Sequence, residues 1–309
     1  MTATDAIEPF ARYDEVPVAG GTLHVARTEV SPGDGELVVL AIHGIASSHM
    51  VWRPTARALA EQRVRACVLA PDLRGRGRSA GLPGPYGLDA GRADLLSVLD
   101  HAGVARAVLV GHSMCAYLAS GLAAEHPERA AAVVLIDSGL DVPSSFERDA
   151  DELIEAMVDA ALEYAGAKYA SAADYLAAWQ THPAFAGRRS KDIDAYVRYE
   201  LTGRPGALRR AVSHAAVRAD ITDLVCDESA RAAIDRVRAP ISLLTAPRGM
   251  HNDYAALPTM FVEAFARAHP HAHIERIPDT NHYTILLGPG PGPTRAAAAI
   301  ARACPDRPA

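Results

Sequence analysis

Residues 107–116 read Ala-Val-Leu-Val-Gly-His-Ser-Met-Cys-Ala, and this stretch decides the fold. Four apolar residues lead into Gly-His-Ser, and small residues with helical spacing follow. The pattern predicts a buried strand that turns sharply into a helix and presents the hydroxyl of Ser113 at the apex. The helix N-terminus beneath that hydroxyl favours developing negative charge. The stretch reads G-x-S-x-C where the nucleophile-elbow pattern reads G-x-S-x-G, so Cys115 departs from the pattern.

Apolar runs on both sides of this stretch alternate with helical patterns. Residues 37–42, 66–70 and 132–136 are continuous apolar runs, which are typical of strands buried on both faces. Residues 13–18 and 23–26 flank an Ala-Gly-Gly turn and predict an edge hairpin. Because strands alternate with helices, we expect an α/β fold with a doubly wound, mostly parallel sheet.

The alternation stops near residue 140 and resumes with an apolar run at 241–245 and a last strand at 273–277. No buried-strand pattern lies between these two parts. We therefore expect an α/β core of residues 1–139 and 237–309, interrupted by a helical cap of residues 140–236.

The expected cap is amphipathic and rich in aromatic residues. One of its helices is expected near residues 207–217. Aromatic side chains suit a cavity for an apolar ligand. Tyr175, Trp179 and Tyr196 are expected to line that cavity.

Composition excludes several classes of partner. The 309 residues carry a net charge of −6 with acids and bases mixed, and no basic stripe indicates nucleic acid. No apolar run reaches the ~18 residues of a membrane helix, and the first residues lack a signal-peptide pattern, so we expect a cytoplasmic protein. The four cysteines lie far apart, so neither a metal nor a cofactor is implied. A homo-oligomer is compatible with the sequence.

A serine nucleophile needs hydrogen-bond donors for the oxyanion that it creates. The strand at residues 37–42 ends in His43-Gly44-Ile45, one βαβα unit before the serine. The backbone N–H groups of Ile45 and Met114 are therefore the expected oxyanion hole, with His43 and Gly44 beside the substrate. The alternative is a tight turn with a packed histidine.

The nucleophile also needs a general base. Among 13 histidines, His282 follows the last predicted strand, and the chain order of serine then histidine fits a triad. His112, His126 and His251 are weaker candidates, and His112 is expected to face away from the apex.

Two aspartates compete for the role of the acid that orients His282. The loop after residues 241–245 usually carries this acid, but it has Gly249 at the expected position and Asp253 a few residues later. Asp137 stands at the tip of the strand that follows the elbow, and a neighbouring strand tip lies within reach of the same histidine. Either residue must be buried against the histidine, so both stay candidates.

These motifs resemble the α/β-hydrolase superfamily over essentially the whole chain. The resemblance rests on residues 43–44, on the D-x-R-G-x-G-x-S turn at residues 72–79, on residues 111–114 and on residues 281–283. The arginines of that turn are expected to fix the loop by hydrogen bonds. An acid at Asp137 is similar to the subset with the acid after the sixth strand, as in haloalkane dehalogenases and the fungal zearalenone lactonase. The cap and the last motif resemble actinobacterial zearalenone lactonases and phthalate-monoester hydrolases.

The resemblance implies a serine hydrolase that cleaves a carboxylic ester or lactone of a bulky, largely apolar small molecule through an acyl-enzyme (EC 3.1.1 class). One alternative is a carbon–carbon bond hydrolase, for which Arg188, Arg189 or Arg248 would hold a substrate carboxylate. A second is a ligand-binding receptor on the same scaffold. Epoxide and haloalkane hydrolysis are disfavoured because they need an aspartate where Ser113 stands.

Overall fold

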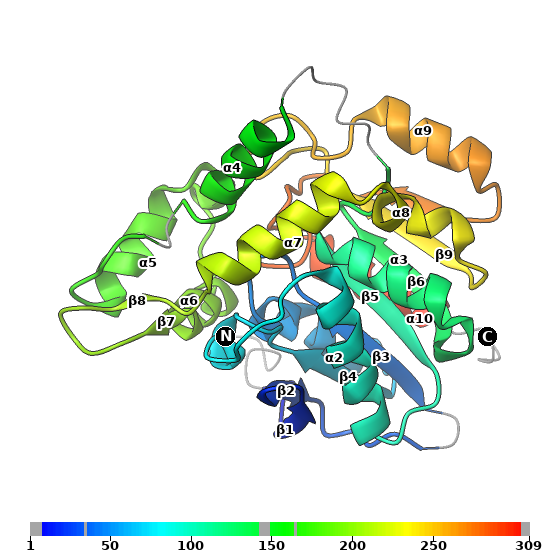
Figure 1. Cartoon of the computed structure of the whole chain (residues 1–309), viewed down its shortest axis with the longest axis horizontal. Helices are drawn as coiled ribbons and strands as arrows, with labels where there is room; N and C mark the ends of the chain where they lie inside the picture. Colours follow the sequence, from blue (N-terminus) through cyan, green and yellow to red (C-terminus); the bar gives the residue numbers. More distant parts are fainter. Residues whose placement is uncertain (1–7, 34–35, 142–148, 164–165, 304–309) are drawn as a thin grey trace.

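A computed structural model describes residues 8–33, 36–141, 149–163 and 166–303 (Figure 1). The strands are β1 (Arg12–Val18), β2 (Gly21–Arg27), β3 (Leu37–Ile42), β4 (Ala66–Pro71), β5 (Ala107–His112), β6 (Ala130–Ile136), β7 (Leu201–Thr202), β8 (Arg209–Arg210), β9 (Ile241–Thr245) and β10 (His273–Arg276). The α-helices are α1 (Arg53–Glu61), α2 (Leu88–His101), α3 (Cys115–Glu125), α4 (Ala150–Ala161), α5 (Ala172–Thr181), α6 (Lys191–Tyr199), α7 (His214–Cys226), α8 (Glu228–Arg231), α9 (Thr259–Ala268) and α10 (Gly292–Arg302). Within this described part, every helix is too short or too polar to cross a membrane.

Eight strands form one sheet in the order β1-β2-β4-β3-β5-β6-β9-β10. Strands β4, β3, β5, β6, β9 and β10 pair in parallel, whereas β1 with β2 and β2 with β4 are antiparallel. This arrangement confirms the predicted doubly wound, mostly parallel sheet with an edge hairpin. Because β3, β5, β6 and β9 are neighbours, the loops at their carboxyl ends meet at one edge of the sheet, where such folds place their sites.

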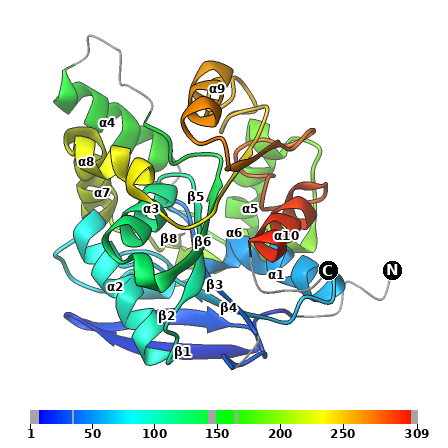
Figure 2. The ribbon, with the colours of Figure 1, turned by 90° about the vertical axis from the view of Figure 1, so that its right-hand side faces the viewer.

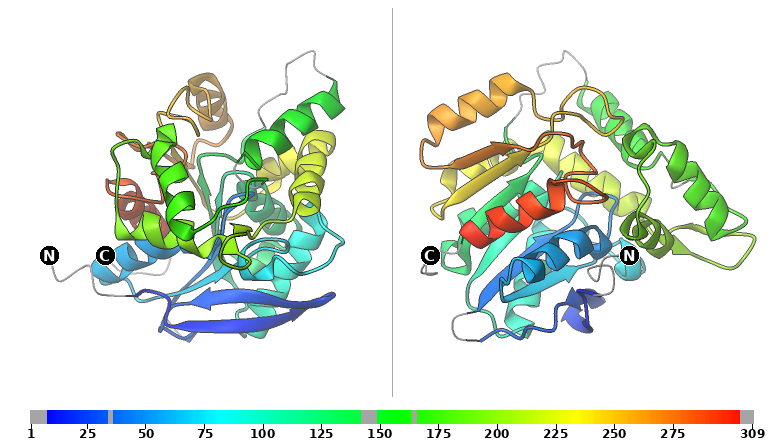
Figure 3. Two further views of the ribbon diagram at one scale, coloured as in Figure 1. Left: turned by 90° about the vertical axis from the view of Figure 1, so that its left-hand side faces the viewer. Right: turned by 180° about the vertical axis from the view of Figure 1, so that it is seen from behind.

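Helices cover both faces of the sheet. Figures 2 and 3 show α1 and α10 on one face, and Figure 2 shows α2 and α3 on the other. In β3, Val39 and Ala41 belong to the hydrophobic cluster on the α1 and α10 side, and Leu40 and Ile42 to the cluster on the α2 and α3 side. Burial of both faces explains why this strand reads as a continuous apolar run.

Residues 140–236, which we call the cap segment, lie between β6 and β9 in the chain. Their described part contributes α4 to α8 and a short antiparallel pair, β7 with β8, but no strand of the main sheet (Figure 1). The pair corrects the helix expected near residues 207–217. The helix begins only at His214, after Ser213 caps it by accepting the Ala216 N–H. The division into core and cap stays a prediction.

Candidate active site

Ser113 stands at the turn between β5 and α3, in the left-handed backbone region with φ of 57°. Its N–H donates to the Ile136 carbonyl at 3.0 Å, which ties the turn to the neighbouring strand. A Cβ on Gly111 would lie 2.4 Å from the Cys115 carbonyl oxygen, closer than atoms approach. The steric requirement of the turn therefore falls on Gly111. Cys115 is the fully buried first residue of α3, where a side chain is tolerated.

His282 lies between Ser113 and Asp137. Its Nδ1 is 2.7 Å from Asp137 Oδ2, and its Nε2 is 2.9 Å from Ser113 Oγ. Because the carboxylate can only accept, Nδ1 carries the proton and the lone pair of Nε2 faces the serine hydroxyl. The Asp137 side chain is fully buried. Its other oxygen accepts the Ala246 N–H at 2.9 Å, so both carboxylate oxygens have a donor.

Asp253, the alternative acid, lies elsewhere. It is exposed in the loop after β9, and the Nδ1 of His282 is directed at Asp137 instead. This loop supplies only the backbone N–H of Ala246 to the Asp137 carboxylate. The structure thus places the carboxylate at the tip of β6 and leaves the loop after β9 without an acid at the site.

His112 does not face away from the site, so that expectation is wrong. It is buried, lines the cavity at Ser113, and its Nε2 donates to the His282 carbonyl at 2.9 Å. Burial, and then the neighbouring His282, lower the pKa of His112 well below its ordinary value, so the ring is neutral. The ring holds the loop that carries His282. Its partner is a backbone carbonyl 170 residues away, which no sequence pattern marks.

The turn after β3 is fixed by His43. Its Nδ1 donates to the Gly44 carbonyl at 2.8 Å, and its Nε2 accepts the Leu73 N–H at 3.0 Å. The Gly44 carbonyl and the Ile45 N–H belong to one planar trans peptide and point in opposite directions. His43 therefore sets the direction of the Ile45 N–H. Complete burial lowers the pKa of His43 to about 4, which keeps the ring in this neutral form.

A cavity of about 370 Å³ opens onto Ser113 and His282. Its wall is mostly apolar and comes from the strand ends, from the loop after β9 and from the cap segment. Besides Ser113, His282, Asp137 and His112, the lining includes Gly44, Ile45, Ala46, Ser47, Met114, Tyr117, Ser138, Met157, Trp179, Tyr196, Arg210, Leu224, Met250, Ala256, Leu257 and Tyr283. The predicted oxyanion donors Ile45 and Met114 thus lie on the same wall as the serine.

Of the expected pocket residues, Gly44, Trp179 and Tyr196 line the cavity, whereas His43 and Tyr175 do not. Both are fully buried. His43 lies behind the turn that it holds. The Tyr175 hydroxyl donates to Glu200 at 2.9 Å, and its ring belongs to the hydrophobic core.

Arg210 is a charged cavity residue that sequence reasoning missed. Its Nη2 donates to the Ala46 carbonyl and pairs with Glu200 at 3.2 Å, and both side chains of the pair are buried. The signal in the sequence is weak, since Arg210 is one arginine among many. Its position depends on β8, which pairs with β7 through only two residues on each strand.

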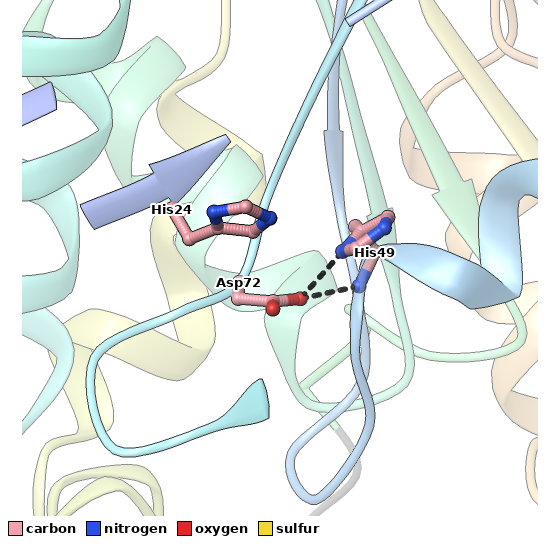
Figure 4. Close-up of side chains that lie close together, drawn as sticks. All are labelled: His24, His49 and Asp72. Atoms are coloured by element: carbon pink, nitrogen blue, oxygen red, sulfur yellow. Dashed lines mark hydrogen bonds and ion pairs between the residues drawn. The ribbon is translucent and has the colours of Figure 1, made fainter. Parts of the chain in front are cut away.

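Among the residues that the structure describes, two groups of side chains have the dimensions of a metal site. The ligand atoms of His24, His49 and Asp72 lie within 4.8 Å of one another, and so do those of Glu163, His182 and His251 (Figure 4 shows the first group). Their members are distant in sequence, so no motif indicated them. In the first group the Nδ1 of His49 already donates to Asp72 at 2.9 Å.

In the second group the Nδ1 of His182 accepts the Ala184 N–H at 3.1 Å, so its Nε2 carries the proton of the neutral ring. Hydrogen bonds therefore engage ligand atoms in both groups.

Comparison with known proteins identifies the family. The sequence matches the family described as alpha/beta hydrolase fold over residues 38–196. The chain belongs to this family. Lipase LipV of Mycobacterium tuberculosis is 36% identical over 157 residues, which cover 51% of this chain and 56% of LipV. The chain thus spans about half the length of the curated relatives that it matches.

Solved structures share the fold of this alpha/beta hydrolase over nearly its full length. E-2-(acetamidomethylene)succinate hydrolase aligns with a TM-score of 0.73 and 20% identity, covering 94% of this chain and 98% of that one. A thioesterase domain from the curacin biosynthetic pathway aligns with a TM-score of 0.71 and 19% identity, with the same coverage of both chains. At these identities the likeness concerns the fold alone.

The elbow geometry predicts opposite effects for two small substitutions. Cys115→Gly should leave ester turnover within a few-fold of wild type, because residue 115 has no steric or conformational demand for glycine. Gly111→Ala should abolish turnover or folding, because its Cβ would overlap the Cys115 carbonyl and the Ala116 Cα. Circular dichroism and initial rates on the purified variants measure both effects. Loss of activity in folded Cys115→Gly would contradict this account.

The buried His43 should make stability fall in acid. In the unfolded chain a histidine binds a proton as pH drops through about 6.5. Folded His43 stays neutral until about pH 4, so its contribution is complete above pH 6.5 and is lost progressively between pH 6.5 and pH 4. From pH 7 to pH 5 this loss is about 2 kcal/mol.

Urea unfolding at pH 7 and pH 5 tests the contribution. The drop in unfolding free energy should be smaller in His43→Gln than in wild type, and unchanged in His101→Gln, which replaces an exposed histidine. Equal drops in all three proteins would contradict the assignment.

Proposed function

We propose that this alpha/beta hydrolase cleaves a carboxylic ester or lactone of a bulky, largely apolar small molecule through an acyl-enzyme. The observation that carries the proposal is the continuous hydrogen-bond chain from Asp137 through His282 to Ser113, at 2.7 and 2.9 Å, at the wall of an apolar cavity. A serine hydroxyl, a base that accepts its proton and an acid that orients the base are the parts that acyl transfer requires.

In the proposed mechanism His282 Nε2 takes the proton of Ser113 Oγ as this oxygen attacks the substrate carbonyl. The buried Asp137 carboxylate stabilises the imidazolium that forms. The carbonyl oxygen becomes an oxyanion and accepts hydrogen bonds from the backbone N–H groups of Ile45 and Met114. His282 then gives its proton to the leaving alkoxide. In the second half of the reaction, His282 activates a water molecule, which hydrolyses the acyl-enzyme. Loss of one oxyanion donor costs about 10²–10³ in kcat in a well-studied protease.

The cavity wall supports an apolar substrate. Trp179, Tyr196, Tyr283 and several aliphatic side chains form most of it. The name of the relative LipV, a lipase, agrees with ester hydrolysis. The carbon–carbon alternative invoked Arg188, Arg189 or Arg248 for a substrate carboxylate, and all three lie outside the lining. The cation on the wall, Arg210, is paired with Glu200.

Replacement of the nucleophile tests the reaction. Ser113→Ala should lower the kcat for p-nitrophenyl esters by at least about 10³-fold, because it removes the hydroxyl that faces His282 Nε2. Ser138→Ala is the matched control, since Ser138 lines the same cavity, and it should stay within a few-fold of wild type. Full turnover by Ser113→Ala would refute the mechanism. A wild-type protein that turns over no ester, lactone or aromatic monoester in a mass-spectrometric panel would favour the receptor.

The identity of the acid is tested by two isosteric changes. Asp137→Asn should lower kcat by about 10³–10⁴-fold, as loss of the orienting acid does in serine proteases. Asp253→Asn should stay within twofold, because the exposed Asp253 does not contact the base. Steady-state kinetics of the two variants decide between them, and the reverse pattern would assign the role to Asp253.

A further inference from the structure

The turn that carries Ile45 is held by side chains from the cap segment. We call residues 44–49 the oxyanion loop. The Tyr196 hydroxyl, on α6, donates to Ser47 Oγ at 3.1 Å. The Arg210 guanidinium, on β8, donates to the Ala46 carbonyl. Two cap elements therefore bond directly to adjacent residues of this loop.

A third cap element reaches the loop through Arg76. The Nε of Arg76 donates to the Ile45 carbonyl at 2.7 Å. Its Nη2 forms an ion pair with Asp220 on α7, and both side chains of the pair are almost fully buried. The guanidinium group is planar and rigid, so the Asp220 carboxylate that holds Nη2 also fixes the direction of the Nε–H, which points at the Ile45 carbonyl.

A fourth link passes through Asp72, the buried carboxylate in Figure 4. One oxygen of Asp72 accepts the backbone N–H of His49 at 2.8 Å and its Nδ1–H at 2.9 Å. The other oxygen accepts the Arg78 N–H at 2.8 Å and the hydroxyl of Tyr199, on α6, at 2.5 Å. The end of the oxyanion loop at His49 is thus joined to the cap through one carboxylate.

These bonds fix the part of the loop on which oxyanion stabilisation depends. Three successive carbonyls are held by side chains: that of Gly44 by His43, that of Ile45 by Arg76 and that of Ala46 by Arg210. Since each peptide is planar, His43 sets the direction of the Ile45 N–H, whereas Arg76 and Arg210 fix the next two peptides and so hold the backbone that follows Ile45. Such donors stabilise the transition state only when they are already aligned.

We infer that the cap segment is part of the scaffold of the oxyanion hole, with Asp220 and Tyr199 as its positioning residues. The inference rests on the function proposed above. Asp220 acts through Arg76 on Ile45, and Tyr199 acts through Asp72 on His49. Neither Asp220 nor Tyr199 lines the cavity, so their removal weakens stabilisation of the oxyanion and leaves substrate binding unchanged.

The chain offers a matched control for each positioning residue. Asp223 lies on the same helix as Asp220, and both accept a backbone N–H at the start of α2, from Leu88 and Gly87 respectively. Only Asp220 pairs with Arg76. Tyr86, the control for Tyr199, donates its hydroxyl to the Leu82 carbonyl at 2.9 Å, away from the oxyanion loop.

Steady-state kinetics of the four variants test the inference. Asp220→Asn should lower kcat about 10-fold or more, a part of the 10²–10³ that a lost donor costs, and Tyr199→Phe about 3-fold or more, with KM within twofold. Asp223→Asn and Tyr86→Phe should stay within twofold in kcat. Tyr199→Phe keeps its ring beside His49, so it remains informative if Asp220→Asn does not fold.

Inhibition by a phenylboronic acid gives a second measurement. Its trigonal boron accepts an electron pair of Ser113 Oγ, whose proton passes to His282 Nε2, and the tetrahedral adduct places a boron hydroxyl in the oxyanion hole. The inhibition constant should rise by the factor by which kcat/KM falls. Positioning variants that match their controls, or that raise KM at constant kcat, would overturn the inference. If the wild-type protein shows no turnover that depends on Ser113, that result would instead contradict the proposed function, on which the inference rests.

Discussion

The parallel register of β5, β6 and β9 is the constraint on which the candidate site depends. His112 pairs with Ile136, and Ile136 pairs with Leu244, so the three strands end side by side. The first residue beyond each of β5 and β6 then donates its N–H to the next strand: Ser113 to Ile136 and Asp137 to Leu244. Both residues adopt left-handed backbone angles, which turn their side chains toward the same histidine. A shift of register would separate the hydroxyl of Ser113 from the carboxylate of Asp137.

The parts that the sequence predicted are local. Ser113 lies in a motif whose geometry follows from strand β5, from Gly111, where a side chain does not fit, and from helix α3, which begins at Cys115. His282 follows from the end of the last strand. The sequence left two candidates for the acid, because Asp137 and Asp253 both follow a strand, and only the contact between His282 Nδ1 and Asp137 Oδ2 shows which carboxylate faces the histidine.

The parts that the sequence missed depend on contacts between distant residues. His112 donates to a backbone carbonyl. Because every residue has one, the sequence does not show which carbonyl is the partner. Tyr175 and Trp179 lie on the same helix and both belong to the hydrophobic core, and only packing shows that Trp179 also reaches the cavity wall whereas Tyr175 does not. The helix expected near residues 207–217 failed because β8 pairs with β7 there, and a two-residue strand is too short for a periodic signal.

Two buried ion pairs lie where the cap segment contacts the turn after β3. Arg76 with Asp220, and Arg210 with Glu200, both place a guanidinium against a loop carbonyl. Such pairs add little to stability, because desolvation offsets much of their attraction. Their value here is geometric. A buried guanidinium is stable only when it is paired with its carboxylate, so each arginine is held in one position. From that position it bonds to a carbonyl of the turn after β3 and fixes the turn.

The position of the carboxylate on β6 has a consequence for how this protein can diverge. The loop after β9 contributes Met250, Ala256 and Leu257 to the cavity wall, and its Ala246 N–H donates to the Asp137 carboxylate. Tyr254 in the same loop is 93% exposed. The side chain of Asn252 in this loop accepts a hydrogen bond from Asn281, the residue before His282, at 3.2 Å. On the proposed function, Met250, Ala256 and Leu257 shape the cavity while Ser113, His282 and Asp137 carry out the reaction, so substitutions at the three wall positions change the substrate and leave the chemistry the same.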